Sequence, residues 1–123
     1  VVWYRKATAQ HLPLARLMLG LAYATGRGTA RDDRQAAEWF EQAANDGLTL
    51  AQYALGMLYS NGRGIQQDWI KARLWLDLAV SGGYVGAAQP LEYATSQLDE
   101  KGLTRARDLA REWQAARTAV RPN

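Results

Sequence analysis

Apolar residues recur along the chain at helical spacing, and polar or glycine-rich stretches separate the apolar segments. Two segments, 13–24 and 49–60, carry an apolar residue at every fourth position, which places those residues on one side of a helix. They are Ala15, Leu19 and Tyr23 in the first segment and Ala51, Leu55 and Tyr59 in the second. We therefore predict a helix over each segment and call both of them A helices.

Each predicted A helix is followed by a tight turn and then by a second helix, the B helix. The turns contain the motif Gly-Arg-Gly at residues 26–28 and 62–64, in which two glycines let the chain reverse its direction. We expect at least one glycine of each motif to adopt positive φ. Asp32 and Asp68 follow the motifs and can accept hydrogen bonds from a first helical turn. The B helices should end before Gly47 and before Gly82 and Gly83.

The helix pair recurs with a period of 36 residues. Trp3, Trp39 and Trp75 lie 36 positions apart, and residues 1–36 share 13 identities with residues 37–72 without a gap. A fixed period of this length indicates a solenoid of stacked helix pairs. We divide the chain, as one domain, into the tail of an upstream unit at 1–11, units at 12–47 and 48–83, and a degenerate unit with a C-terminal cap at 84–123.

Glycines inside the predicted A helices indicate close packing between the two helices of a pair. Gly20 and Gly56 each cost about 1 kcal/mol in helix propensity, so a close contact should offset that cost. We expect the indole of Trp39, on the B helix, to fill the space beside Gly20. The facing stripe of the B helices consists of Ala36, Trp39 and Ala43 in the first unit and Ala72, Trp75 and Ala79 in the second.

The last part of the chain departs from the repeat and predicts a capping helix. Thr104 is the expected N-cap of this helix. Its apolar stripe, which should pack on the solenoid, comprises Ala106, Leu109, Ala110, Trp113 and Val120. The array should therefore end in this helix rather than in another B helix.

Two sequence motifs carry a resemblance to a known family. They are A-x-x-x-L-G-x-x-Y-x-x-G-x-G and D-x-x-x-A-x-x-W-x-x-x-A, which follow one another in the repeating units. This pattern resembles the Sel1-like repeat, a relative of the tetratricopeptide repeat. The resemblance implies an all-α, right-handed α-α superhelix of antiparallel helix pairs. It also implies a bacterial adaptor or scaffold that binds a partner protein or peptide, often in envelope assembly or signalling, and it favours the periplasm or the cell exterior.

In the related tetratricopeptide pattern, the A helices line a concave groove that binds the partner. We transfer those groove positions to this chain by counting from the leucine of each motif. The resulting groove residues are Leu14, Leu17, Leu21 and Ala24, then Leu50, Tyr53, Met57 and Ser60, and in the third unit Gly86, Gln89, Tyr93 and Ser96, with Thr25, Asn61 and Gln97 at the rim. The alternative is that Leu17 and Tyr53 seal neighbouring A helices against each other.

Composition argues against an enzyme. The 123 residues are 48% hydrophobic, carry a formal net charge of +3 and include one histidine and no cysteine, which excludes disulfides and thiolate metal sites. His11 occupies the turn position that Gly47 fills in the next unit. Paired acidic residues such as Asp32 and Asp33 lie at predicted helix starts, where negative charge is favourable. We expect no catalytic residues, no metal and no cofactor, and a hydrolase is the least favoured interpretation.

Two further kinds of contact follow from the ends of the chain. Residues 101–123 contain six basic and two acidic side chains, which makes nucleic acid or another polyanion the alternative partner. Against it, the one aromatic residue of that segment, Trp113, belongs to the apolar stripe and is not free to stack on bases.

An incomplete helix at residues 1–9 would expose Val1, Val2, Trp3 and Tyr4 and favour self-association. No apolar run is long enough to span a membrane.

Overall fold

The computed structural model describes residues 12–120, with side chains as far as Arg117. Within this range the secondary structure is entirely helical, with six α-helices, one short 3-10 helix and no strand. The predicted all-α fold of packed helix pairs is confirmed. The expectations for His11 and for the apolar edge at residues 1–9 lie outside the described residues.

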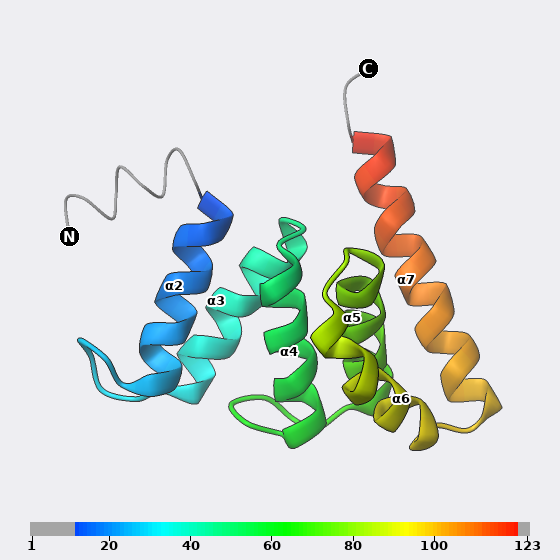
Figure 1. Ribbon diagram of the computed structural model, residues 1–123, viewed down its shortest axis with the longest axis horizontal. Helices are drawn as coiled ribbons and strands as arrows, with labels where there is room; N and C mark the ends of the chain where they lie inside the picture. Colours follow the sequence, from blue (N-terminus) through cyan, green and yellow to red (C-terminus); the bar gives the residue numbers. More distant parts are fainter. Residues whose placement is uncertain (1–11, 121–123) are drawn as a thin grey trace.

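The helices follow one another across the molecule, from α2 at one end to α7 at the other (Figure 1). Their bounds are α2 Leu12–Thr25, α3 Asp33–Asn45, α4 Thr49–Asn61, α5 Trp69–Ser81, η1 Val85–Ala87, α6 Ala88–Ser96 and α7 Glu100–Val120. The pairs α2 with α3 and α4 with α5 pack most extensively, and α3 also packs on α4. Helix α5 contacts both α6 and α7. The predicted A and B helices are thus α2 and α3 in the first unit and α4 and α5 in the second.

The predicted residues of the two Gly-Arg-Gly turns and the predicted N-caps of the B helices take the expected conformations. Asp32 Oδ1 accepts hydrogen bonds from the amides of Arg34 and Gln35, both at 3.1 Å, and Asp68 caps α5 in the same way. All four glycines of the two Gly-Arg-Gly motifs have positive φ, between 68° and 78°. The two turns therefore share one backbone conformation.

The close approach at Gly20 and Gly56 is confirmed, but the side chains that fill the space are not the tryptophans. A Cβ on Gly20 would lie 2.6 Å from Phe40 Cε1, and a Cβ on Gly56 would lie 2.7 Å from Leu76 Cγ. The expectation for Trp39 is therefore wrong, because α3 is rotated so that the next residue faces α2. Trp39 is only half-buried.

Trp75 is buried because the capping helix covers it. Its ring meets the ring of Trp113 of α7 edge to face, with 5.9 Å between the centroids. In the apolar stripe of α7, the buried side chains are Ala106 and Ala110. The Val120 side chain lies outside the described part. Helix α7 packs on α5, as expected for the predicted capping helix.

The start of α7 differs from the prediction. The helix begins at Glu100, and the Asp99 carboxylate accepts a hydrogen bond of 2.8 Å from the amide of Gly102. Thr104 is an exposed residue within the helix, so it is not the N-cap. The capping carboxylate of Asp99 comes five residues earlier and adds more than one helical turn to α7.

Candidate partner-binding face

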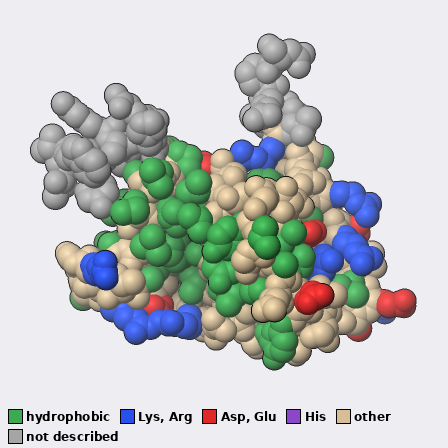
Figure 2. Space-filling view, viewed as in Figure 1, with side chains coloured by type: hydrophobic (Ala, Val, Ile, Leu, Met, Phe, Trp, Pro, Cys, Tyr) green, Lys and Arg blue, Asp and Glu red, His purple; other side chains and the backbone are tan. Residues whose placement is uncertain are grey.

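Large apolar side chains lie exposed on the A helices. The exposed fractions are 53% for Leu14, 46% for Met18 and 42% for Leu21 on α2, and 47% for Leu50 on α4. Figure 2 shows hydrophobic side chains gathered over α2 and α4 on this side of the molecule. We call this surface the A-helix face, comprising Leu14, Met18, Leu21, Leu50, Tyr53, Ala54, Met57 and Tyr93.

The predicted groove residues divide by their burial. The exposed ones are Leu14, Leu21, Thr25, Leu50, Gly86, Gln89, Tyr93, Ser96, Asn61 and Gln97, and the half-buried ones are Ala24, Tyr53, Met57 and Ser60. Leu17 is 5% exposed and belongs to the hydrophobic core. The prediction that Leu17 lines an accessible surface is therefore wrong.

Tyr53 and Met18 refine the outline of the face. The Tyr53 ring lies 4.9 Å from the ring of Tyr84, which follows α5, so Tyr53 packs towards the next unit and exposes only part of its side chain. Met18 was not among the predicted residues. Its position four residues after Leu14 and three before Leu21 places it on the same side of α2, and this spacing could have identified it.

The A-helix face is almost free of charge. Helices α2 and α4 contain a single ionisable residue that is charged at neutral pH, Arg16. Its guanidinium forms a 2.7 Å ion pair with Asp46 at the end of α3. A ligand on this face would therefore meet apolar surface rather than unpaired charge.

The border of the face towards the Gly-Arg-Gly turns is polar and then basic. The hydroxyls of Thr25 and Ser60 donate to carbonyl oxygens of their own helices, at 2.8 and 3.0 Å. Beyond them lie exposed Arg27 and Arg63, and Figure 2 shows basic side chains beside the lower left border of the apolar patch. Arg63 reaches Asp33 at 3.4 Å.

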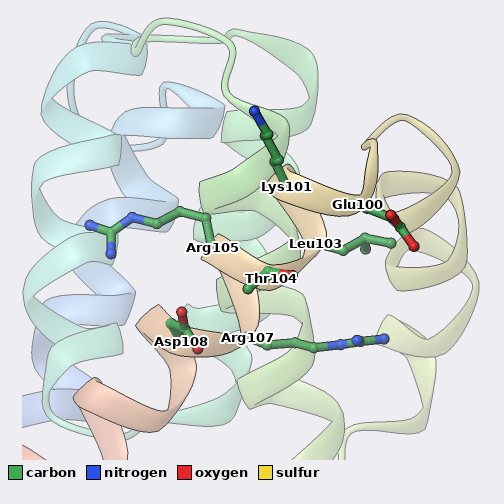
Figure 3. A pocket seen from close by; sticks show the side chains of 7 residues that line it. All are labelled: Glu100, Lys101, Leu103, Thr104, Arg105, Arg107 and Asp108. Atoms are coloured by element: carbon green, nitrogen blue, oxygen red, sulfur yellow. The ribbon is translucent and has the colours of Figure 1, made fainter.

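The basic helix α7 does not form a converging anion site. A shallow depression is lined by seven residues of α7 itself, and in Figure 3 Lys101, Arg105 and Arg107 point to different sides of the helix. Arg105 lies 3.9 Å from Glu112. Arg117 donates to the carbonyl oxygens of Asn45 and Asp46. This arrangement does not favour nucleic acid or another polyanion as the partner.

The described residues offer little to catalysis. No group of three or more His, Cys, Asp or Glu among them could hold a metal. The shifted pKa among them is that of Tyr59, which burial raises above its ordinary value of 10.0, with further increases from Glu41 and Asp68. A tyrosine held neutral in this way is a core residue rather than a base. In the same range, no helix is both long and apolar enough to cross a membrane.

Comparison with known proteins decides the family. Residues 13–48 and 49–84 each match the Sel1 repeat. The chain belongs to the Sel1 repeat family. No curated protein sequence matches it. Sel1 repeat proteins generally mediate protein–protein interactions, and their fold is typically a scaffold without catalytic activity.

Two solved structures resemble this Sel1 repeat chain. One is c5321, a protective antigen present in uropathogenic Escherichia coli strains that displays an SLR fold, with 29% identity over 98% of the chain and a TM-score of 0.83. The chain spans only 28% of the length of that antigen. The other is a Sel1 repeat protein from Oxalobacter formigenes, with 38% identity over 73% of this chain and 68% of that one, and a TM-score of 0.69.

Proposed function

We propose that this Sel1 repeat chain is an adaptor that holds a partner protein by binding one of its apolar segments on the A-helix face. The observation that supports this proposal is the group of large apolar side chains, 42 to 53% exposed, on two helices whose one charged residue is already paired. Contiguous exposed apolar surface on a folded protein commonly marks an interaction site.

Burial of the exposed leucines would contribute favourable free energy to binding a partner. Fully burying a leucine side chain contributes about 1.5–3 kcal/mol. The face holds three half-exposed leucines, together with methionine side chains that can adapt to different partners. Such a surface binds by apolar contact, so raising the ionic strength should weaken the complex little.

The proposal also assigns the chain to a bacterial envelope or signalling assembly. Its support is the likeness to the Escherichia coli antigen, whose description as a protective antigen fits a protein that the host encounters. Fractionation of the source cells, followed by detection with an antibody, tests this assignment. Recovery in the cytoplasmic fraction alone would contradict the envelope assembly.

Site-specific photo-crosslinking tests the face itself. A photoreactive amino acid replaces Leu21 or Leu50 in the full-length protein in its source cells, and a matched control carries it at Gln42, exposed on α3. We expect a crosslinked partner polypeptide from the two leucine positions and none from Gln42. Crosslinks from Gln42 alone would move the partner site to the B helices.

A pair of charge substitutions provides the complementary test. Leu21→Glu combined with Leu50→Glu should abolish capture of the crosslinked partner, with a change of only about 1 kcal/mol in the free energy of unfolding, because each is a surface substitution that changes stability by about 0.5 kcal/mol. Gln42→Glu introduces one such charge outside the face and should leave capture unchanged. A large fall in Tm for the leucine pair would show that these residues belong to the core.

A further inference from the structure

The ion pair between Arg16 and Asp46 has no counterpart in the second unit. In the first unit, Arg16 Nη1 on α2 lies 2.7 Å from Oδ2 of Asp46, the C-cap of α3. The equivalent residues, 36 positions later, are Gln52 on α4 and Gly82, the C-cap of α5. A Cβ on Gly82 would lie 2.1 Å from Thr49 Cγ2, so a carboxylate there would displace the Thr49 side chain. Gln52 therefore lacks the acidic partner that Arg16 has.

Gln52 is a buried amide of which only the nitrogen is engaged. The residue is 3% exposed, and Nε2 donates a 3.3 Å hydrogen bond to the carbonyl oxygen of Ala44. This bond decides which end of the amide is the nitrogen, because a carbonyl oxygen requires a donor. Among the described residues none donates to Oε1, and this oxygen is not sealed from solvent. A buried acceptor is costly to leave unpaired.

Gln52 lines a small cavity at the junction of four segments of the chain. The cavity measures about 220 Å³ and lies between the α3–α4 turn, the start of α4, the end of α5 and helix α7. Its other lining side chains are the polar Thr49, Ser81, Gln114 and Arg117 and the apolar Leu78 and Trp113. Because Oε1 keeps contact with solvent, it is the atom of Gln52 that a ligand in this cavity would meet.

The charge at the cavity favours a neutral ligand. The Arg117 guanidinium is held at the wall, where it donates to carbonyl oxygens at the end of α3. This fixed positive charge would repel an ammonium or guanidinium group. A carboxylate would place a negative oxygen against Gln52 Oε1, which needs a donor. A neutral group with a donor and an acceptor suits both sides, because its acceptor can meet the hydroxyl of Thr49 or Ser81.

The size of the cavity fits one side chain rather than a whole small molecule. Pockets that enclose drug-sized ligands usually measure about 300–1,000 Å³, and this cavity is smaller, at about 220 Å³. A primary carboxamide combines N–H donors and a carbonyl acceptor in one compact neutral group. Asn and Gln are the side chains that carry it.

We infer that this cavity binds the carboxamide of an Asn or Gln side chain of a partner protein, whose N–H group donates to Gln52 Oε1. The bound amide would supply the polar contact that Gly82 cannot make. None of the lining residues belongs to the A-helix face, so this contact goes beyond the proposed function and provides a second, separate point of attachment.

NMR titration of the isotope-labelled full-length protein with small ligands tests this inference. Propionamide, a minimal carboxamide, should shift the Gln52 side-chain amide and the Trp113 indole N–H to saturation, with a dissociation constant on the order of 10 mM. Butanone has the same size but carries a methyl group in place of the NH2 group. It should bind at least about fivefold more weakly, because it leaves Oε1 buried without a donor. Propionate and propylammonium should also bind more weakly than propionamide.

Three variants connect the shifts to the cavity, with Trp113 as the reporter. Gln52→Met removes the oxygen at similar length, and it should weaken propionamide at least about fivefold and leave butanone nearly unchanged. Ser81→Trp, at the exposed last residue of α5, fills the cavity and should abolish the shifts. Ser96→Trp, at the exposed last residue of α6, is the matched control and should leave binding unchanged. Circular dichroism and Tm verify that each variant is folded.

The opposite outcomes overturn the inference. Equal binding of butanone in the parent protein would show that Oε1 takes no part, and this comparison decides the point even if Gln52→Met does not fold. Tighter binding of propionate or propylammonium would make the cavity a site for a charged group. Absent shifts, or shifts that survive Ser81→Trp, would show that the carboxamide does not enter the cavity. The crosslinks from Leu21 and Leu50 decide the proposed function independently of these results.

Discussion

The indole Nε1 of Trp113 donates a 3.1 Å hydrogen bond to Oδ1 of Asn45, the last residue of α3. The Arg117 guanidinium lies 4.6 Å over the same indole and donates to the carbonyl oxygens of Asn45 and Asp46. Because Trp113 also meets Trp75 of α5, the capping helix connects the end of the first helix pair to the second pair.

The contacts of Trp113 should contribute measurably to the free energy of unfolding. Trp113→Phe keeps an aromatic ring beside Trp75 but loses the N–H group, and it should cost about 1 kcal/mol of unfolding free energy. Trp113→Ala also removes the ring and should cost about 3 kcal/mol. Urea denaturation checks both values. Asn45→Ala should add little in the Trp113→Phe background, whereas fully additive effects would show that the hydrogen bond contributes nothing.

The two Gly-Arg-Gly turns should respond differently to the same substitution. Gly28 and Gly64 have almost the same φ, 78° and 77°, so alanine should cost about 1–2 kcal/mol of conformational strain at either site. A Cβ on Gly64 would also clash with the backbone carbonyl of Asp33, whereas none of the described atoms lies within 4 Å of one on Gly28. Gly64→Ala should therefore lower Tm more than Gly28→Ala. Equal losses would mean that the turn of the second unit moves freely away from α3.

Adjacent aromatic residues on α3 should differ in their contribution to the core. Phe40 is almost completely buried against Gly20, and Phe40→Ala should cost about 3–5 kcal/mol. Trp39 is half-buried, so Trp39→Ala should cost clearly less, despite the larger side chain. Denaturation of the two variants under identical conditions makes the comparison. A greater loss at Trp39 would contradict the observed rotation of α3.

Tyr59 should make stability fall at alkaline pH. Its pKa is raised in the folded protein, so above pH 10 the unfolded chain releases this proton more readily than the folded chain does. Stability contributed by the neutral phenol is complete below pH 10 and is lost as pH rises through the folded pKa. Tyr59→Phe should flatten this decline relative to the parent protein. Tyr93→Phe, at an exposed position, serves as the control for the loss of a phenol hydroxyl.

The sequence predicts which segments are helical better than it predicts how each helix is rotated about its own axis. Capping by Asp32 and Asp68 depends on local hydrogen bonds, and such bonds follow directly from residue type. Trp39 and Phe40 are neighbours about 100° apart on α3, and tertiary packing decides which one faces α2. The start of α7 differs from the prediction because both Asp99 and Thr104 suit the N-cap role chemically, and the Asp99 carboxylate is the group that accepts the hydrogen bond from the first turn.

The candidate face was predictable only in part for a related reason. Leu17 and Leu21 lie one turn apart on α2, yet 5% of the first and 42% of the second is exposed. Their spacing is compatible with a shared surface, but Leu17 belongs to the hydrophobic core and Leu21 does not. Periodicity within one helix does not say which positions the neighbouring helices cover, so it could not separate the buried leucine from the exposed one.

The contacts of α5 should make it the slowest helix of the described part to open. Helix α5 is held by α4, α6 and α7. In a linear array each unit protects its neighbours, so a helix held from several sides opens last. Amide hydrogens of α5 should therefore exchange with solvent more slowly than those of α6. A partner bound across α2 and α4 would slow exchange in these two helices and leave the exchange of α6 unchanged, so binding would be recorded as protection confined to the A-helix face.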